Sequence, residues 1–102
     1  MTPTQLTLRY LRENGWLAEV VERWVPGANV RKDLFGFIDI VALKDGETLG
    51  VQATSYSNIS ARVTKIVASD AVNEVRKANW SLWVVGWRKV ENRWREKIVD
   101  CS

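Results

Sequence analysis

The chain has 102 residues, of which 46% are hydrophobic and 26% are charged, and its 15 basic and 12 acidic side chains leave a net charge of +3. This length predicts a single domain, residues 1–102, and the small positive excess favours a polyanionic partner. The absence of histidine and the lone Cys101 exclude Ser-His-Asp triads, disulfide frameworks and cysteine or histidine zinc sites, so catalysis would need carboxylates, amides, hydroxyls, lysines and metal ions.

The first third of the chain predicts a helix, an ambiguous segment and a loop. Residues 3–13 are expected to form a helix, because Thr2 and Gln5 have the spacing of a capping box. Residues 16–25 fit both helical spacing and the β-branched content of a strand, and we favour the strand. Residues 26–33 are expected to form a loop.

The middle of the chain predicts a β-hairpin. Residues 37–43 are apolar on both faces except for Asp39, which is typical of a covered central strand. Residues 44–47 supply the turn. In the strand that follows, Gln52 and Thr54 fall on the same face because side chains alternate with period two.

An amphipathic helix is expected next. Four apolar residues share one helical face: Ile59, Val63, Ile66 and Val67. Arg62 and Lys65 lie together on another face, and the helix continues or breaks near residues 69–70. Residues 80–87 are expected to form a strand, and a last strand alternates basic side chains with the others: Arg93, Arg95 and Lys97 against Trp94, Glu96 and Ile98. The order of helix, three-stranded meander, helix and two strands indicates an α+β fold.

Asp39 is the most informative residue for function. A carboxylate between apolar strand residues is costly to bury unless a cation or strong donors compensate it. Gln52 and Thr54 present oxygen ligands from the neighbouring strand, and three acidic residues precede the site: Glu19, Glu22 and Asp33. Such oxygens suit Mg²⁺, which can activate water beside a phosphodiester. The alternative is a structural carboxylate that pairs with an arginine or caps a turn.

Two segments carry a resemblance to a known family. The run RKDLFGFIDIVALKDG at residues 31–46, followed by LGVQATS at residues 49–55, resembles the central motif of archaeal-type Holliday junction resolvases in the PD-(D/E)XK nuclease superfamily. The similarity extends over about residues 14–60. It implies an αβββαβ, restriction endonuclease-like core, a mixed sheet flanked by helices, here with an added C-terminal strand. It also implies Mg²⁺- or Mn²⁺-dependent hydrolysis of structured or branched DNA.

The resemblance assigns roles to particular residues. Asp39 matches the metal-binding aspartate, and Gln52 matches the glutamate of the family's Glu-x-Lys motif. Thr54 stands where the lysine is expected, and Lys65 on the following helix is either its replacement or an ordinary solvated side chain. The family's acidic residue on the first helix is not evident, so Glu22 or Asp33 is expected to substitute as a metal ligand.

The predicted partners follow from the basic side chains. Five are expected to contact DNA phosphates: Arg31, Lys32, Arg62, Lys65 and Arg88. The stripe at residues 93, 95 and 97 is either a further phosphate contact or a solvated edge that prevents aggregation. Since resolvases cut two strands symmetrically, the resemblance also implies a homodimer.

Two alternatives to an active nuclease stay open. One is a nuclease-fold protein that has lost catalysis and serves as a DNA-binding or protein-interaction module. The other is a subunit whose site a partner chain completes. With no apolar run near the roughly 20 residues of a membrane helix and no apolar segment over residues 1–11, we expect a cytoplasmic location.

Overall fold

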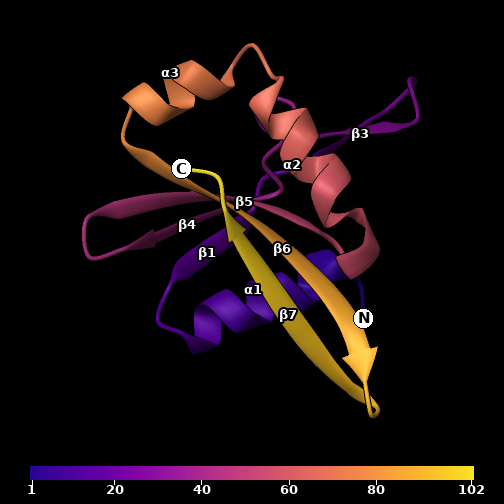
Figure 1. Ribbon diagram of the computed structural model, residues 1–102. Coiled ribbons are helices and arrows are strands. Elements are labelled where there is room, and N and C mark those ends of the chain that lie inside the picture. Colours follow the sequence, from indigo (N-terminus) through magenta and orange to yellow (C-terminus); the bar gives the residue numbers. More distant parts are fainter.

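The computed structural model describes residues 1–102 and contains one five-stranded sheet with helices on both faces (Figure 1). The sheet has the order β1-β4-β5-β6-β7, with bounds Leu17–Val20, Ile40–Lys44, Glu47–Ser55, Trp80–Val90 and Arg93–Asp100. Helix α1 (Pro3–Glu13) covers one face, and α2 (Ile59–Val67) and α3 (Val72–Lys77) cover the other. A short 3-10 turn, η1 (Tyr56–Asn58), leads into α2.

The sheet is mixed. The β1/β4, β4/β5 and β6/β7 pairs are antiparallel, whereas β5 and β6 are parallel and are connected through α2 and α3. The predicted α+β fold, with a mixed sheet flanked by helices and a C-terminal strand, is therefore confirmed. No helix has both the length and the apolar character that a membrane crossing requires.

Helix α1 begins and ends where the sequence predicts. Thr2 and Gln5 form the reciprocal capping box, with backbone-to-side-chain distances of 3.0 and 3.2 Å. The helix is held against the sheet by a buried polar contact as well as by apolar packing, since Trp87 Nε1 donates a hydrogen bond to Thr7 Oγ1 at 2.8 Å.

The segment before the central strands differs from the prediction. Residues 16–25 form two strands rather than one, because the chain leaves the main sheet after β1 and turns into β2 (Arg23–Val25). The predicted loop over residues 26–33 was partly wrong, since β3 (Val30–Lys32) pairs with β2 in a separate two-stranded hairpin. This β2–β3 hairpin projects beside α2 (Figure 1).

The predicted strand over residues 37–43 begins later than expected, at Ile40. Phe37 and Ile38 are buried in a tight turn instead, closed by a bridge between Leu34 and Ile38. Asp39 therefore lies at a bend immediately before β4. The predicted turn at residues 44–47 is confirmed as the connection between β4 and β5.

Strand β5 separates two hydrophobic cores. Leu49 and Val51 pack on the α1 side, whereas Gly50 faces Ile38 and Leu82 on the side of α2 and α3. Alternation places Gln52 and Thr54 on that second side, as predicted. Both are buried, so polar groups stand within an otherwise apolar layer.

Of the two alternatives left open for the helix after β5, the structure shows the break near residues 69–70, between α2 and α3. The chain breaks after Val67, which is 57% exposed and therefore does not belong to the buried face to which the periodicity assigned it. The helix packs closely on β6 because Gly86 has no side chain there: a Cβ at this position would lie 2.4 Å from two side-chain carbons of Ile59. This close approach brings the first residue of α2 against the strand.

Candidate functional site

Three carboxylates converge at the end of β4. Glu22, Asp33 and Asp39 each place one oxygen within 4.8 Å of the other two. Glu22 immediately precedes the β2–β3 hairpin and Asp33 immediately follows it, so the hairpin brings its two ends together next to Asp39. The main-chain oxygen of Asp39 accepts hydrogen bonds from the N–H groups of Val21 and Glu22, at 2.8 and 3.3 Å. We call these three residues the acidic cluster.

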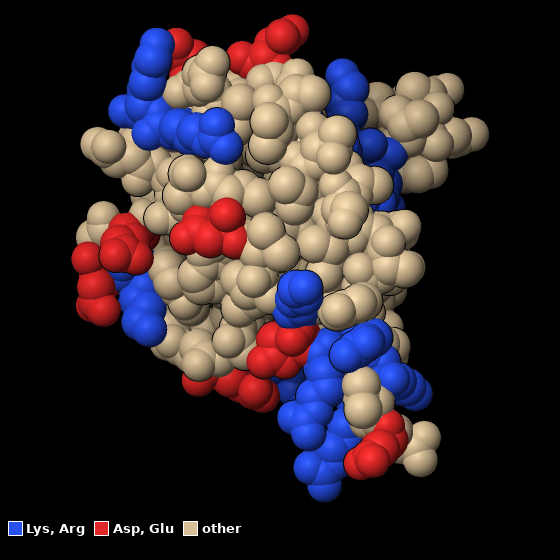
Figure 2. Space-filling view, in the orientation of Figure 1, with Lys and Arg blue, Asp and Glu red and all other residues tan.

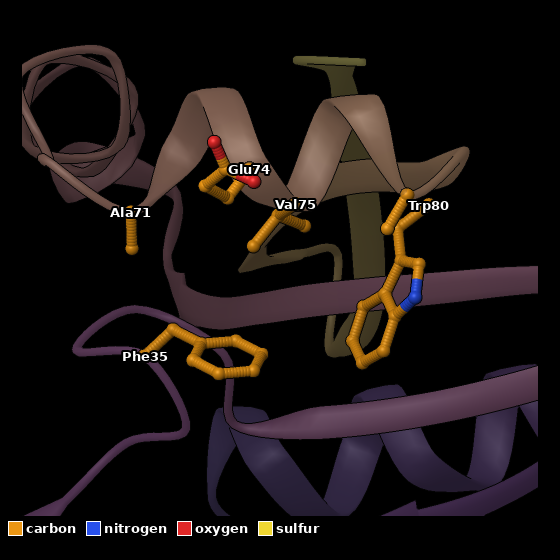
Figure 3. A pocket seen from close by; sticks show the side chains of 6 residues that line it. Phe35, Ala71, Glu74, Val75 and Trp80 are labelled. Carbon is orange, nitrogen blue, oxygen red and sulfur yellow. The ribbon is translucent and has the colours of Figure 1, made fainter.

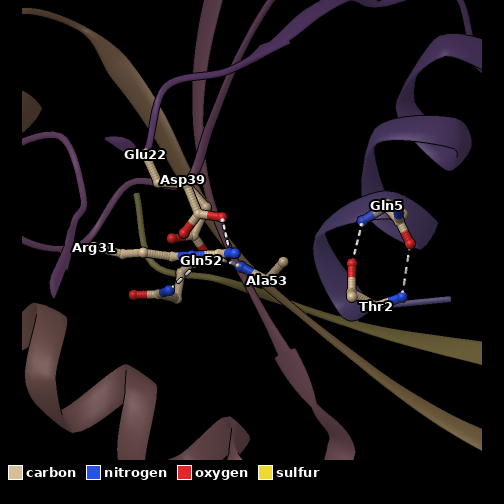
Figure 4. A network of polar contacts seen from close by, with 7 residues as sticks. All are labelled: Thr2, Gln5, Glu22, Arg31, Asp39, Gln52 and Ala53. Carbon is tan, nitrogen blue, oxygen red and sulfur yellow. Dashed lines mark hydrogen bonds and ion pairs between the residues drawn. The ribbon is translucent and has the colours of Figure 1, made fainter. Parts of the chain in front are cut away.

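Asp39 is the buried member of the acidic cluster, with 4% of its surface exposed. Its N–H donates to the carbonyl of Val51 at 2.8 Å, which ties it to β5. Its Oδ2 accepts two hydrogen bonds from the same strand, from Gln52 Nε2 at 2.7 Å and from the N–H of Ala53 at 2.9 Å (Figure 4). The carboxylate faces β5, as the metal-site interpretation requires.

Gln52 supplies the second unusual feature. Its Nε2 donates a hydrogen bond to Asp39, but its Oε1 is buried and has no hydrogen-bond partner. Buried polar atoms are almost always paired, and one without a partner in a native fold requires an explanation such as a bound ion or water. A bound cation, or a water that donates a hydrogen bond, would satisfy this oxygen.

The acidic cluster disfavours the ionised form of Asp39. The pKa of Asp39 is raised from 3.8 to about 7, first by burial and then by the neighbouring carboxyl group of Asp33 and the charge of Glu22, against the lowering effect of the Ala53 N–H. The ionised form of this carboxyl group is therefore disfavoured, and a proton or a nearby cation would stabilise the group.

Two basic side chains lie against the outer members of the cluster. Arg31 on β3 pairs with Glu22 at 3.3 Å, and Lys65 on α2 pairs with Asp33 at 3.8 Å. Asp33 also lines an open pocket of about 350 Å³, together with Arg31, Lys32, Gly36 and Lys65. This pocket is therefore lined by three cations next to the acidic cluster, a suitable environment for an anion such as a phosphate.

The residues present fit a divalent metal ion. Mg²⁺ and Mn²⁺ prefer oxygen ligands, and three carboxylates with one unpaired amide oxygen form an all-oxygen donor set. Glu22, Asp33, Asp39 and Gln52 would hold such an ion, the four residues that the sequence predicted as ligands. The alternative of Asp39 as a carboxylate paired with an arginine does not fit, since no basic side chain forms an ion pair with it and its Oδ2 accepts from Gln52 and Ala53.

The other predicted residues have separate positions. Thr54 is buried on β5, two residues beyond Gln52, and its hydroxyl cannot supply the charge of a lysine. Lys65 is 44% exposed and reaches the cluster through Asp33. Glu19 lies outside the cluster and pairs weakly with Arg12 at 3.9 Å. Arg62 lies on α2, about one turn before Lys65, whereas Arg88 lies on β6 and its guanidinium stacks over the ring of Tyr56 at 4.3 Å.

The β2–β3 hairpin, which brings Glu22 and Asp33 to the site, was not predicted from the sequence. Its signal was the Pro26-Gly27 turn between two short β-branched and aromatic segments, which is also a hairpin pattern. Tyr56, the aromatic platform for Arg88, was not predicted either. No local pattern singles out an aromatic residue that gains its partner from a strand about thirty residues further along the chain.

A second pocket, of about 170 Å³, lies between the turn before β4 and helix α3 (Figure 3). Its lining is apolar apart from one carboxylate and shares no residue with the acidic cluster: Phe35, Ala71, Glu74, Val75, Ala78 and Trp80. Phe35 and Trp80 meet edge to face with ring centres 6.0 Å apart. This pocket offers packing surface and no arrangement of catalytic groups.

Comparison with known proteins does not identify a family for this chain. No protein-family model matches it, and no curated protein matches it.

Proposed function

We propose that the chain is a metal-dependent endonuclease of the PD-(D/E)XK type that acts on structured or branched DNA. The observation that carries the proposal is the acidic cluster beside the unpaired Gln52 oxygen, flanked by cations. The chain order of the main-sheet strands and the helices α1 and α2 supports it as well. This order, α1, β1, β4, β5, α2, β6, is the αβββαβ order of the family that the sequence resembles.

Each residue of the site has a role in this proposal. Asp39, Gln52, Glu22 and Asp33 would hold Mg²⁺ or Mn²⁺, which when bound supplies an activated water and neutralises charge on a phosphodiester. Gln52 and the Ala53 N–H fix the orientation of the Asp39 carboxylate. Arg31 and Lys32 line the adjacent pocket, where they would position the phosphate.

In this proposal Lys65 replaces the lysine of the Glu-x-Lys motif, whose position on β5 is occupied by Thr54. It approaches the cluster from α2, and its ion pair with Asp33 holds the ammonium group close to the proposed ligands. A positive charge at this distance would stabilise charge that develops on the phosphate oxygens during hydrolysis. Thr54 completes the buried polar face of β5 without contributing charge.

A nuclease assay tests the proposal directly. Four-way junction, flap and duplex DNA are incubated with the wild-type protein and Mg²⁺ or Mn²⁺, and with Asp39→Asn and Lys65→Ala. Cleavage is expected to require the divalent ion, to be abolished by Asp39→Asn and to fall about 100-fold or more with Lys65→Ala, with partial recovery in Lys65→Arg. Glu19→Gln, which removes a carboxylate outside the cluster, should cleave like wild type. Full activity in Asp39→Asn would overturn the assignment.

A second candidate is a DNA-binding or protein-interaction module that keeps the nuclease scaffold without cleavage. Thr54 at the lysine position favours it, and so do the ion pairs that occupy Glu22 and Asp33. Under this alternative the protein binds DNA with an affinity that falls as salt rises, with no metal requirement and no cleavage in the assay above.

A further inference from the structure

The end of the β6–β7 hairpin carries a strong positive charge. Figure 2 shows Lys and Arg side chains gathered over this end of the molecule. Register separates them by face: Arg88 lies opposite Arg95, Gly86 opposite Lys97 and Val90 opposite Arg93. Directly opposed residues point to the same side of a sheet, so four cations share one face: Arg88, Arg93, Arg95 and Lys97. We call these four residues the basic stripe.

No negative charge on the strands balances the basic stripe. The remaining residues of β6 and β7 on this face are apolar or glycine, and none of the four cations forms an ion pair with a carboxylate. Two of them instead lie over a single aromatic ring, since Arg88 and Lys97 approach the ring centre of Tyr56 at 4.3 and 5.6 Å. Gathering like charges in this way is unfavourable in the free protein and favourable once an anion binds.

The basic stripe lies on the same side of the sheet as Gln52. Thr54, Gly86 and Lys97 form one row across three strands, next to the row that contains Gln52. From strand spacings, Lys97 lies roughly 12 Å from Gln52 and Arg93 roughly 22 Å. Arg62, on α2, lies on this side of the sheet as well. A polyanion held in the cationic pocket beside the acidic cluster would therefore reach the stripe along one face of the molecule.

The spacing of the charges suits a nucleic-acid backbone. Alternate residues of a strand are about 6.8 Å apart, so Arg93, Arg95 and Lys97 present charge over roughly 14 Å. Duplex DNA advances 3.4 Å per base pair, which places the stripe about four to seven base pairs from a phosphate close to Gln52. We infer that the β6–β7 hairpin is a second DNA contact, a phosphate-binding arm that engages the backbone of duplex DNA away from the site of cleavage.

This inference deepens the proposed function and rests on DNA being the partner, but it does not require cleavage. The alternative is that the charges only protect an edge strand from pairing with another chain. The two differ in what happens to DNA affinity when the charges are removed.

The test is a salt titration of DNA binding in the Asp39→Asn background, without divalent ions, followed by fluorescence anisotropy of a labelled 20-base-pair duplex. Arg93→Gln, Arg95→Gln and Lys97→Gln are combined in one variant. Removing three phosphate contacts is expected to lower the slope of log affinity against log salt by about 2 to 3, and to weaken binding at least about tenfold at 0.1 M salt. Arg95→Gln alone should lower the slope by about 0.9, which keeps the test valid if the triple variant folds poorly.

A matched control removes the same charge elsewhere. Arg9, Lys77 and Lys89 are changed to Gln together, and Lys89 is the informative member because it lies on the opposite face of the same hairpin, beside Trp94. This control should keep the wild-type slope. An unchanged slope in the stripe variant, or aggregation in that variant with no loss of DNA affinity, would overturn the inference.

The outcomes separate this inference from the nuclease proposal. Stripe-dependent binding without any cleavage by the wild-type protein supports the arm and rejects the nuclease. Cleavage by wild type, together with a stripe variant that binds and cuts duplex normally, supports the nuclease and rejects the arm. Stripe-dependent binding to phosphatidylserine vesicles with no affinity for DNA would assign the charges to a membrane surface and overturn the inference.

Discussion

Gln52 donates its Nε2 hydrogen bond to Asp39 Oδ2 at 2.7 Å, and its own Oε1 remains buried without a partner. The contact joins β5 to the bend before β4, so the relative position of the two side chains is set by the sheet rather than by a flexible loop. The carboxyl group of Asp39, which is costly to ionise, therefore lies beside the amide oxygen of Gln52, which is costly to leave without a partner. A divalent cation would stabilise both oxygens.

Divalent ions should stabilise the fold. An ion that binds the native state alone raises the free energy of unfolding by about 2.7 kcal/mol when its concentration is 100 times Kd. We expect Mg²⁺ or Mn²⁺ to raise the thermal midpoint of the wild-type protein, and a chelator to reverse the change. Asp39→Asn should abolish the response, as measured by calorimetry.

The control for this experiment is Glu19→Gln. Glu19 is an exposed carboxylate on β1 outside the acidic cluster, so its removal tests for general charge effects. It should respond to the ions as wild type does. An equal response in Asp39→Asn and Glu19→Gln would mean that the ions bind elsewhere.

Stability without metal should depend on pH through Asp39. Its folded pKa of about 7 lies above the ordinary 3.8, so between these values the native state holds more protons than the unfolded state. The free energy of unfolding therefore falls as pH rises through this window, with an Asp39 contribution on the order of 4 kcal/mol. Urea denaturation at pH 4 to 8 with chelator should show the fall in wild type, and a flatter profile in Asp39→Asn.

Gln52→Glu should exchange stability for metal affinity. The new carboxyl group would lie where Gln52 now donates to Asp39, so without metal two acids would share one proton. We expect the free energy of unfolding at pH 7 to fall by about 1 to 3 kcal/mol with chelator, and Mg²⁺ affinity to rise in calorimetric titration. Gln5→Glu makes the same chemical change at an exposed capping position that accepts either residue, and should be neutral for both quantities.

The sequence predicted the parts of this site that depend on local pattern. The capping box located α1, and period-two alternation placed Gln52 and Thr54 on one face of β5. The isolated polar residue in an apolar run identified Asp39. These features depend on neighbours within a few residues, where side-chain direction follows directly from secondary structure.

The features that the sequence could not predict depend on distant contacts. Glu22 and Asp33 were candidates, but only the β2–β3 hairpin, which the prediction replaced with a loop, brings them together. Val67 fits the apolar periodicity of α2 yet is exposed at the end of the helix, whereas its neighbour Ile66 is buried. Long-range packing decided each of these cases.

Helix α2 should be sensitive to a single methyl group on the strand beneath it. In Gly86→Ala the new Cβ would lie 2.4 Å from side-chain carbons of Ile59 and 3.2 Å from the Cα of Tyr56, so the helix or its first residues must move. Overpacking of this kind costs about 1 to 3 kcal/mol. The movement would also separate Lys65 from Asp33, so we expect Gly86→Ala to lower cleavage as well as stability.

A double-mutant cycle distinguishes this clash from a general effect of alanine in a strand. Ile59→Ala creates space and costs about 2 to 5 kcal/mol on its own, since Ile59 is buried. If the two side chains collide, the double variant Gly86→Ala/Ile59→Ala loses less stability than the sum of the single variants, because the added methyl group occupies the space that Ile59 vacates. Urea denaturation of the four proteins measures the coupling. Strict additivity would show that α2 does not depend on the close approach at Gly86 and that Lys65 is positioned by other contacts.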